Sequence, residues 1–461
     1  MKILDYKFYY FLGVGGIGMS ALARYFNHYK KKTAGYDKTS TVLTKRLESE
    51  GIICHYEENT SLLKDLLKDY RKEEVLIVYT PAVPNDHREF IYLRENGYEI
   101  LKRSAVLGKI TEQFKTIAIA GTHGKTTTTT LVTHILKSAG INCFSFMGGI
   151  SKNYDTNLLL GDVNASETYV VVEADEYDRS FLTLQPYIGL ITSVDADHLD
   201  IYGSEDHVKE GYTLFAEKVK KEGILIVKKN VDNDLALTRK RLIYSLNLDT
   251  EYCADSIRIE NAQFLYDIKS PVEPVSPVAL GIPGLHNVEN SVAATAIAQQ
   301  LGIKSDVIRK ALSSFKGVKR RFDYRLKEGN CVFIDDYAHH PEELKATIDS
   351  VKKLYPNKKI TGIFQPHLFS RTRDFADGFA ESLQMLDVCL LLEIYPAREK
   401  PIEGVNSSML LSKMREMKKM VLTRSQLMEE LKSNRPEVLI TMGAGDIDTL
   451  VEPIEKLLLE K

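Results

Sequence analysis

Short apolar runs alternate with helical patterns along the whole chain of 461 residues. This alternation is typical of parallel sheets that carry helices on both faces. Two nearly continuous apolar runs, residues 169–172 and 188–194, indicate strands buried on both faces. No internal repeat at a fixed period is present, which excludes a solenoid. Since domains average roughly 150 residues, the sequence predicts an α/β protein of about three domains.

The first domain is predicted to span residues 1–112. It opens with a strand at residues 9–12, a glycine turn and a helix at residues 17–27, and its second strand ends at Asp37. One further strand and two helices are expected at residues 75–79, 88–96 and 104–112. The last of these helices leads out of the domain.

The second and third domains are predicted at residues 113–317 and 318–461. The second begins with a strand at residues 116–120, a glycine loop and a helix that Gly140 ends near residue 138. Hairpins and then a closing helix are expected at residues 251–278 and 288–301. A hinge follows at residues 312–319, and the alternation restarts with strands at residues 332–334, 360–364, 388–392 and 438–441.

The strongest local signal lies where a predicted strand meets a predicted helix, and it reads Ala120-Gly121-Thr122-His123-Gly124-Lys125-Thr126. In a phosphate-binding loop, backbone amides and the positive helix end hold phosphate oxygens, a lysine reaches the terminal phosphates and a threonine binds Mg²⁺. The strict pattern GxxxxGK[ST] is not met, because Ile119 stands where its first glycine belongs. The segment therefore predicts a shortened phosphate-binding loop, with an ordinary strand-to-helix turn as the alternative.

Acidic residues follow two of the predicted buried strands in the second domain. Glu173 ends one strand, and Asp175, Glu176 and Asp178 come directly after it. Ligands of open α/β sheets bind at the carboxyl ends of strands, so we expect Glu173 to bind the Mg²⁺ of the phosphate loop and some of the other acids to be solvated. After the next strand, His198 lies among aspartates, where it would bind a metal, shuttle a proton or cap its own loop.

A glycine-rich segment near the N-terminus reads Gly13-Val14-Gly15-Gly16-Ile17-Gly18. It follows a predicted strand and opens a helix, and Asp37 lies nineteen residues past the last glycine. This is the spacing of a dinucleotide-binding fold, so the segment predicts a ligand that contains phosphate. NAD is one candidate.

Two polar segments follow neighbouring strands of the third domain. They read Asp335-Asp336-Tyr337-Ala338-His339-His340-Pro341 and Gln365-Pro366-His367-Leu368-Phe369-Ser370-Arg371-Thr372-Arg373. Histidines and arginines at adjacent strand ends are suited to bind a carboxylate. The alternative is a solvated basic loop, which we favour for Arg373 because Asp374 stands next to it.

Charge and cysteine usage exclude several classes of protein. Lys and Arg number 61 against 63 Asp and Glu, which argues against nucleic-acid or polybasic membrane binding. No run reaches the roughly 18 apolar residues that a membrane span requires. The five cysteines are scattered and never form a CxxC pair, as expected of a reduced cytoplasmic protein.

Taken together, these motifs resemble the Mur ligase family of bacterial cell-wall synthesis over essentially the whole chain. The segments that match in order and spacing are GTHGKT, EADE, DADH, GLHNVEN at residues 284–290, Arg320-Arg321-Phe322, DDYAHHP, and FQPH with Arg371. The resemblance implies a Rossmann-like N-terminal domain for a UDP-sugar, a central P-loop ATPase domain and a Rossmann-like C-terminal domain for an amino acid. Within the family, the motifs are most similar to the type that joins L-alanine to UDP-N-acetylmuramate.

The resemblance also implies a role for each motif. The UDP-sugar pyrophosphate would bind Gly15, Gly16, Ile17 and Gly18, with Asp37 at the uridine-ribose end, which displaces NAD. ATP would bind Gly121, Thr122, His123, Gly124, Lys125, Thr126 and Thr127, with His286, Asn290, Arg321 and Asp336 completing its site. One Mg²⁺ would be held by Thr126 and Glu173 and a second by His198, with Mn²⁺ as a substitute. L-alanine would be recognised by Tyr337, His339, His367 and Arg371.

The implied reaction forms an acyl phosphate with help from Lys125, and the alanine amine then attacks it while His198 or His339 takes a proton. Closure of the hinge near residues 317–321 would assemble the site. Two positions depart from the family: Tyr177 stands where serine is common, and Leu368 stands where arginine is frequent.

Three alternatives stay open at this point. A recycling ligase of the same family would join a whole tripeptide to the same sugar. A P-loop switch protein would bind or hydrolyse ATP without ligation, and an NAD-dependent oxidoreductase would use only the N-terminal motif. For the partners we expect the three small substrates, no nucleic acid and no membrane, and a monomer or weak homodimer.

Overall fold

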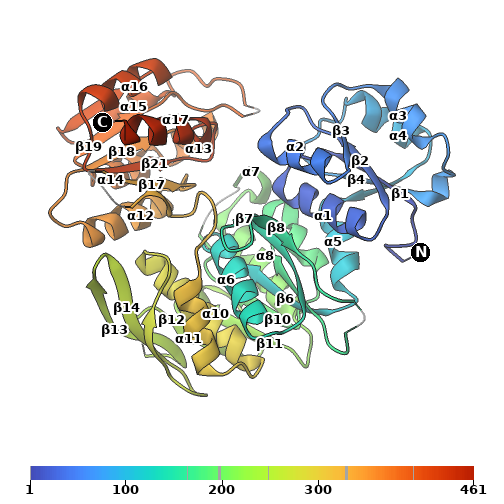
Figure 1. Ribbon diagram of the computed structural model, residues 1–461, viewed down its shortest axis with the longest axis horizontal. Helices are drawn as coiled ribbons and strands as arrows, with labels where there is room; N and C mark the ends of the chain where they lie inside the picture. Colours follow the sequence, from blue (N-terminus) through green and yellow to red (C-terminus); the bar gives the residue numbers. More distant parts are fainter. Residues whose placement is uncertain are drawn as a thin grey trace. The chain divides into compact units, whose positions relative to one another are not determined.

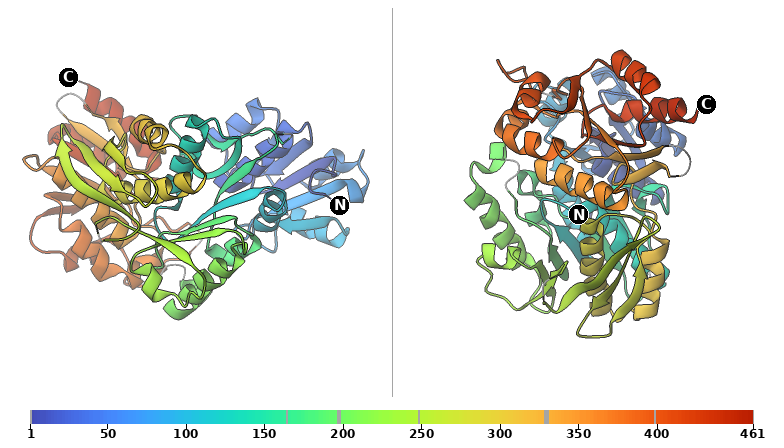
Figure 2. Two further views of the ribbon diagram at one scale, coloured as in Figure 1. Left: turned by 90° about the horizontal axis from the view of Figure 1, so that it is seen from below. Right: turned by 90° about the vertical axis from the view of Figure 1, so that its left-hand side faces the viewer.

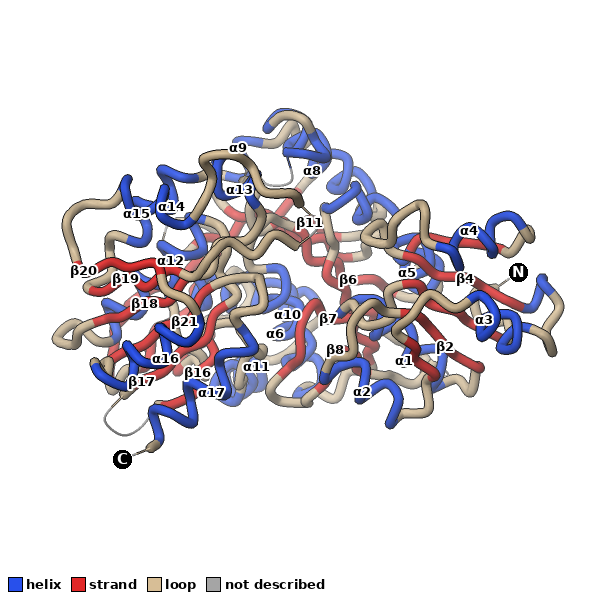
Figure 3. Tube along the Cα trace, turned by 90° about the horizontal axis from the view of Figure 1, so that it is seen from above, coloured by secondary structure: helices blue, strands red, loops and turns tan. Residues whose placement is uncertain are grey.

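The computed structural model describes residues 2–163, 165–195, 199–247, 249–327, 331–397 and 399–460. The chain divides into two compact units, Met1–Cys253 with Ser270–Glu273 and Val292–Ala311, and Ala254–Lys269 with Pro274–Ser291 and Leu312–Lys461. Helices and strands alternate through both units (Figure 3). Among the described residues, no helix is long and apolar enough to cross a membrane. The predicted α/β class is confirmed, with three sheets in all.

The first sheet belongs to the first unit and is drawn in blue in Figure 1. Its strands are β1 (Phe8–Leu12), β2 (Lys32–Tyr36), β3 (Ile53–His55), β4 (Val75–Tyr79) and β5 (Glu99–Lys102). The helices of this segment are α1 (Ile17–His28), α2 (Val42–Ser49), α3 (Thr60–Leu67), α4 (Arg88–Glu95) and α5 (Arg103–Thr111). The strands are all parallel in the order β3-β2-β1-β4-β5. The order reverses at β1, and such a switch point is where open α/β sheets bind ligands.

Alternation along β1 explains why helices cover both faces of this sheet. Successive side chains of a strand point to opposite faces. Phe8 and Tyr10 pack in one core with Leu63 of α3 and Leu93 of α4. Tyr9 packs in the other core, where its ring stacks on Phe26 of α1 with the ring centres 3.8 Å apart.

The second sheet has ten strands and holds the phosphate loop. Its strands are β6 (Lys115–Ala120), β7 (Cys143–Ser151), β8 (Thr156–Leu159), β9 (Tyr169–Glu173), β10 (Ile188–Ile191), β11 (Ile224–Lys228), β12 (Arg241–Ser245), β13 (Tyr252–Glu260), β14 (Gln263–Lys269) and β15 (Val275–Ala279). Its helices are α6 (Lys125–Ser138), α7 (Leu199–Tyr202), α8 (Glu205–Lys218), α9 (Val231–Asp234), α10 (Leu285–Gln300) and α11 (Ser305–Ser314), with a 3₁₀ segment η2 (Tyr177–Thr183). The strand order is β15-β14-β13-β12-β11-β10-β6-β9-β7-β8. Strand β6 therefore lies between β10 and β9, which brings the polar ends of both neighbours to the loop that follows β6.

The third sheet belongs to the second unit and is coloured orange to red in Figures 1 and 2. Its strands are β16 (Asp323–Leu326), β17 (Val332–Asp336), β18 (Ile360–Phe364), β19 (Val388–Leu391), β20 (Lys418–Val421) and β21 (Val438–Met442). Its helices are α12 (Pro341–Leu354), α13 (Phe369–Asp374), α14 (Ala376–Leu383), α15 (Ser407–Lys413), α16 (Arg424–Ser433) and α17 (Asp448–Leu459). The order is β16-β17-β21-β18-β19-β20, parallel except for the edge strand β16.

Most elements expected from the sequence are present within a few residues of their predicted bounds, but two expectations need correction. The strand predicted at residues 188–194 ends at Ile191, because Thr192 and Ser193 leave the sheet and hydrogen-bond to the phosphate loop. The hinge predicted to begin at residue 312 starts too early, because α11 continues to Ser314.

Candidate active site

The glycine loop of the first sheet connects β1 to α1 at the switch point. Gly16 precedes the helix, and Ile17 and Gly18 form its first turn. The N–H of Gly15 donates a hydrogen bond of 2.8 Å to Oδ2 of Asp37, which follows β2. A β-carbon on Gly15 would come within 2.8 Å of the same oxygen. Asp37 thus lies against the glycine loop, and the glycine at position 15 makes that approach sterically allowed.

The phosphate loop connects β6 to α6 and is anchored by the segment that leaves β10. The N–H of His123 donates to Oγ of Ser193 at 2.8 Å, and the hydroxyl of Thr192 donates to the carbonyl of His123 at 2.5 Å. Gly121 has a φ of 131°, and a β-carbon there would come within 2.0 Å of the Thr192 hydroxyl. Gly124 has a φ of 81°, so both glycines adopt backbone angles that other residues rarely reach.

The last three predicted ATP-binding residues of this segment form the first turn of the helix α6. Lys125 is its first residue, and Thr126 and Thr127 follow with buried side chains. The N-terminal amides of a helix and its dipole attract phosphate oxygens, which fits the predicted role of the segment.

The Lys125 ammonium group is saturated by acceptors of its own surroundings. Nζ donates to the carbonyls of Gly121 and Thr122 at 2.6 Å and 3.2 Å, and to Oε1 of Glu176 at 2.9 Å. Burial acts to lower the pKa of Lys125, but the charges of Glu176 and Glu173 raise it above its ordinary value. The lysine is therefore cationic at neutral pH.

Glu176 is a residue of this site that sequence reasoning missed, since the acids after Glu173 are expected there to be partly solvated. Only 4% of Glu176 is exposed, and its Oε2 atom makes no hydrogen bond with any described residue. Burial raises the pKa of its carboxyl, and the Lys125 ammonium opposes that rise. The sequence offered only an acid three residues after the strand-end acid Glu173, because the burial of Glu176 and its contact with Lys125 depend on the fold.

Glu173 is arranged as a metal ligand would be. It ends β9, and its Oε2 atom is buried without a hydrogen-bond partner among the described residues. A β-carbon on Gly148 of β7 would come within 2.0 Å of that oxygen, so the glycine leaves room for the carboxylate. A buried carboxylate oxygen that lacks a donor fits a divalent cation. His198, the predicted ligand of a second ion, lies outside the described residues, within which no group of three or more metal-binding side chains gathers.

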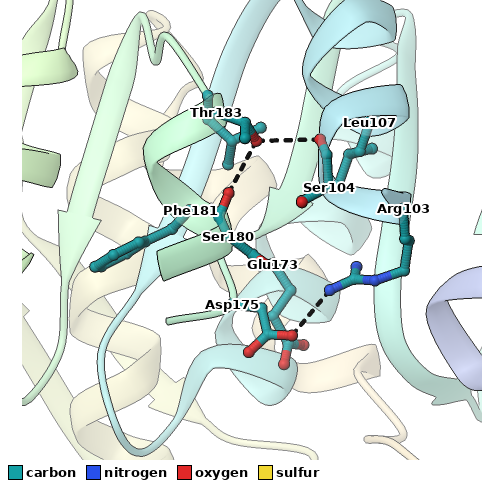
Figure 4. A pocket seen from close by; sticks show the side chains of 9 residues that line it. Arg103, Ser104, Leu107, Glu173, Asp175, Ser180, Phe181 and Thr183 are labelled. Carbon is teal, nitrogen blue, oxygen red and sulfur yellow. Dashed lines mark hydrogen bonds and ion pairs between the residues drawn. The ribbon is translucent and has the colours of Figure 1, made fainter. Parts of the chain in front are cut away.

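A small hollow opens beside Glu173 in the first unit (Figure 4). Side chains from α5, from the acidic segment after β9 and from η2 line it. Arg103 faces the two acids there and donates a hydrogen bond of 2.9 Å to Oδ2 of Asp175. Arg103 is thus a second residue that sequence reasoning missed.

The second unit holds the other predicted ATP-binding residues. His286 and Asn290 lie in the first turns of α10, where the Asn290 amide donates to Oδ1 of Asn287 at 3.3 Å. A β-carbon on Gly284 would come within 2.6 Å of the His286 ring. Burial lowers the pKa of His286 to about 4, so its ring is neutral at pH 7. The ring centre of Phe322 lies 6.2 Å from that of His286.

Asp336 and Arg321 are held close together in the same unit. Asp336 ends β17, and its two carboxylate oxygens accept the N–H groups of Phe322 and Ala338 at 2.8 Å and 2.7 Å. Burial raises the pKa of Asp336 to about 6, and Arg321 acts to lower it. The guanidinium of Arg321 lies 4.8 Å from the ring centre of Tyr337. The structure therefore brings these predicted ATP and amino-acid residues together.

Three of the four predicted L-alanine residues form a continuous aromatic row. The rings of Tyr337 and His339 are 5.3 Å apart, and those of His339 and His367 are 6.4 Å apart. Nδ1 of His339 lies 3.2 Å from Oε2 of Glu343, an acid that sequence reasoning also missed. The fourth residue, Arg371, lies in α13, which begins two residues after His367.

The chain matches three domains of known ligases, one after another. The matches are to the Mur ligase family catalytic domain at residues 8–115, the Mur ligase middle domain at residues 119–298, and the Mur ligase glutamate ligase domain at residues 320–445.

Individual proteins match along the full length. A UDP-N-acetylmuramate–L-alanine ligase of Phocaeicola vulgatus is 47% identical over 463 residues, with 100% of both proteins covered. The crystal structure of a UDP-N-acetylmuramate-alanine ligase from Thermotoga maritima is 25% identical, covers 98% of each chain and superposes with a TM-score of 0.77. A murein peptide ligase from Psychrobacter arcticus has a TM-score of 0.71 and covers 99% of each chain, but at 21% identity this likeness shows the fold alone.

Proposed function

The chain belongs to the Mur ligase family, and from this membership we propose how its residues join L-alanine to UDP-N-acetylmuramate. It is an ATP-dependent acid–amino-acid ligase with UDP-N-acetylmuramate–L-alanine ligase activity in peptidoglycan synthesis. The observation that carries this assignment is the 47% identity to such a ligase over the whole of both chains. The likeness to the murein peptide ligase, at 21% identity, shows the fold alone and does not support the tripeptide-joining alternative.

We assign one substrate to each of the three predicted domains. Residues 1–112 bind the sugar nucleotide through the glycine loop, residues 113–317 bind ATP through the phosphate loop, and residues 318–461 bind L-alanine. The phosphate loop supports the second assignment, because its helix N-terminus and its cationic Lys125 suit a polyphosphate.

The first chemical step activates a carboxylate. An oxygen of the lactyl carboxylate attacks the γ-phosphorus of ATP, and the bond between that phosphorus and the bridging oxygen of the β-phosphate breaks. ADP departs, and the lactyl group becomes an acyl phosphate. Lys125 neutralises the charge that spreads over the transferred group. Mg²⁺ would be held by Thr126 and Glu173, and a second ion by His198, and these ions would supply further charge neutralisation.

The second step forms the amide bond. The alanine nitrogen attacks the acyl carbon, a tetrahedral intermediate forms, and phosphate leaves while a base takes a proton from the amine. His339 is our candidate base, with His198 as the second. The contact of His339 Nδ1 with Glu343 favours a proton on Nδ1, which makes Nε2 the acceptor. Tyr337, His367 and Arg371 recognise the amino acid in this proposal.

Phosphate release with ATP, Mg²⁺ and UDP-N-acetylmuramate tests this function. L-alanine, other amino acids or the tripeptide are added separately, and the products are weighed by mass spectrometry. We expect release to require both the sugar nucleotide and L-alanine, with a product heavier by one alanyl residue. ATP hydrolysis that ignores both substrates would instead support a P-loop switch, and a product heavier by the tripeptide would support the recycling ligase.

We propose a cytoplasmic enzyme that acts as a monomer or weak homodimer on small-molecule substrates. The near-balanced charge and the scattered cysteines support this proposal.

A further inference from the structure

Arg103 lies between the glycine loop, which is expected to bind an anion, and the acidic segment after β9, which is expected to bind Mg²⁺. It is the first residue of α5. A β-carbon on Gly18 would come within 3.0 Å of its Nη1 atom and 3.1 Å of its Cδ atom, so the side chain packs on the glycine loop. On its other side, Nη2 donates to Oδ2 of Asp175 at 2.9 Å. One side chain thus contacts both the glycine loop and the acidic segment after β9.

The Arg103–Asp175 pair borders the hollow beside Glu173 and is open to solvent. Figure 4 shows the guanidinium pointing toward the carboxylates of Asp175 and Glu173. The side chains of Arg103 and Asp175 are 21% and 40% exposed, so solvent reaches both. Partly exposed ion pairs contribute only about 0–1 kcal/mol, so this one is easily exchanged.

We propose that Arg103 is a substrate-binding residue whose guanidinium exchanges Asp175 for an anionic group of the sugar nucleotide. The inference rests on the proposed function. UDP-N-acetylmuramate carries two such groups, a pyrophosphate and a lactyl carboxylate, and the planar fork of arginine matches either one. When the substrate is absent, the Asp175 carboxylate accepts the hydrogen bond that Arg103 would donate to the substrate anion. The guanidinium is therefore paired with an anion both before and after the substrate binds.

A purely structural role for Arg103 is the competing explanation, because other contacts join the end of β5 and the start of α5 to the segment after β9. Lys102 Nζ lies 2.6 Å from Oδ2 of Asp178, and the Thr183 hydroxyl donates to the carbonyl of Ser104 at 3.1 Å. Lys102 is next to Arg103 and makes the same kind of ion pair, yet it is not among the residues that line the hollow. It therefore serves as a matched control.

The experiment titrates the full-length protein, without ATP, with UDP-N-acetylmuramate and with UDP-N-acetylglucosamine, which lacks the lactyl carboxylate. We expect Arg103→Met to weaken binding of UDP-N-acetylmuramate about tenfold or more, the loss of a charge-assisted hydrogen bond. Lys102→Met should change it less than twofold. An equal loss for both ligands identifies the pyrophosphate as the bound anion, and a loss confined to UDP-N-acetylmuramate identifies the carboxylate.

Two further variants keep the inference testable. Thermal unfolding checks that each variant folds. If Arg103→Met does not fold, Arg103→Lys is used in its place, and it should bind UDP-N-acetylmuramate several-fold more weakly than wild type does. Asp175→Asn removes the competing charge and should tighten UDP-N-acetylmuramate binding several-fold, whereas unchanged or weaker binding would rule out the exchange.

The possible results distinguish a failure of the role of Arg103 from a failure of the proposed function. Wild-type protein that binds no UDP-N-acetylmuramate contradicts the proposed function itself. Wild-type binding that Arg103→Met leaves unchanged, or that Lys102→Met weakens equally, contradicts only the role of Arg103.

Discussion

The ammonium group of Lys125 lies 2.9 Å from Oε1 of Glu176, and this contact joins the phosphate loop to the acidic segment after β9. The carbonyls of Gly121 and Thr122 accept the other two hydrogen bonds of that group. An ammonium group has three donors, so all of them are used. An incoming phosphate must therefore replace at least one of these acceptors, and Glu176 fixes the position from which the lysine starts.

Replacing Lys125 by alanine should prevent acyl phosphate formation. The transferred group would lose the cation that neutralises its charge, and loss of such stabilisation costs roughly 100-fold or more in rate. Phosphate release with all three substrates measures the effect. Binding of UDP-N-acetylmuramate should stay within about twofold of wild type, because the glycine loop belongs to another sheet. Normal turnover by Lys125→Ala would overturn the assignment of the phosphate loop.

Replacing Glu176 by glutamine should destabilise the protein. At pH 8, above the pKa of about 7 to which burial raises the Glu176 carboxyl, the buried Lys125 charge would lose its ionised counter-ion, which costs about 3 kcal/mol of unfolding free energy. Urea unfolding measures this change. In the double variant with Lys125→Met, both charges are absent, so we expect most of the loss to be recovered. If the double variant lost as much stability as the two single variants together, the ion pair would not be the cause of the loss.

The sequence predicts the strands well but not the partners of the site residues. Strands such as β9 and β21 are buried on both faces, so each is an apolar run that is visible without any tertiary information. The pairing of Lys125 with Glu176 depends on how the chain turns after β9, and the pairing of Arg103 with Asp175 joins residues that are 72 positions apart. Neither contact leaves a periodic pattern in the sequence.

The same limit applies to the glycines. The glycines of the phosphate loop are conspicuous because they stand between a strand and a helix. Gly148 lies inside β7, and only its distance from Glu173 explains why a side chain is absent there.

Replacing Gly148 by alanine should weaken the use of Mg²⁺. The new β-carbon would come within 2.0 Å of Glu173 Oε2 and displace the carboxylate. Gly148 is not among the glycines with positive φ, so the substitution acts through this contact alone. We expect the Mg²⁺ concentration for half-maximal phosphate release to rise about tenfold, a change of about 1.4 kcal/mol. Glu173→Gln should act in the same direction, and an unchanged Mg²⁺ dependence in both variants would remove Glu173 from the metal site.

Replacing Leu368 by glycine should stabilise the protein. Leu368 has a φ of 69° and a ψ of 135°, a backbone conformation that residues with a β-carbon rarely adopt and that costs about 1–3 kcal/mol. The residue links His367 to α13, so the gain in stability should come with weaker L-alanine binding as that link becomes more flexible. Urea unfolding and the KM for L-alanine measure the two effects. Leu368→Ala keeps the strain and loses the side chain, so it should be less stable than wild type. The strain explanation fails if glycine and alanine destabilise alike.

Acid should destabilise the protein through His286. Burial lowers the pKa of this ring to about 4 from an ordinary value of about 6.5, so between these pH values the unfolded chain binds more protons than the folded one. The neutral ring therefore contributes at most about 3 kcal/mol to the free energy of unfolding. This contribution is complete above pH 6.5 and is lost as the pH falls to about 4. Burial raises the pKa values of Asp335 and Asp336 to about 6, which acts in the opposite direction, so the comparison must be with a variant. The unfolding free energy of His286→Gln should fall less steeply than that of wild type between pH 6.5 and pH 4.5. Parallel pH profiles would mean that the folded ring binds its proton as readily as the unfolded one.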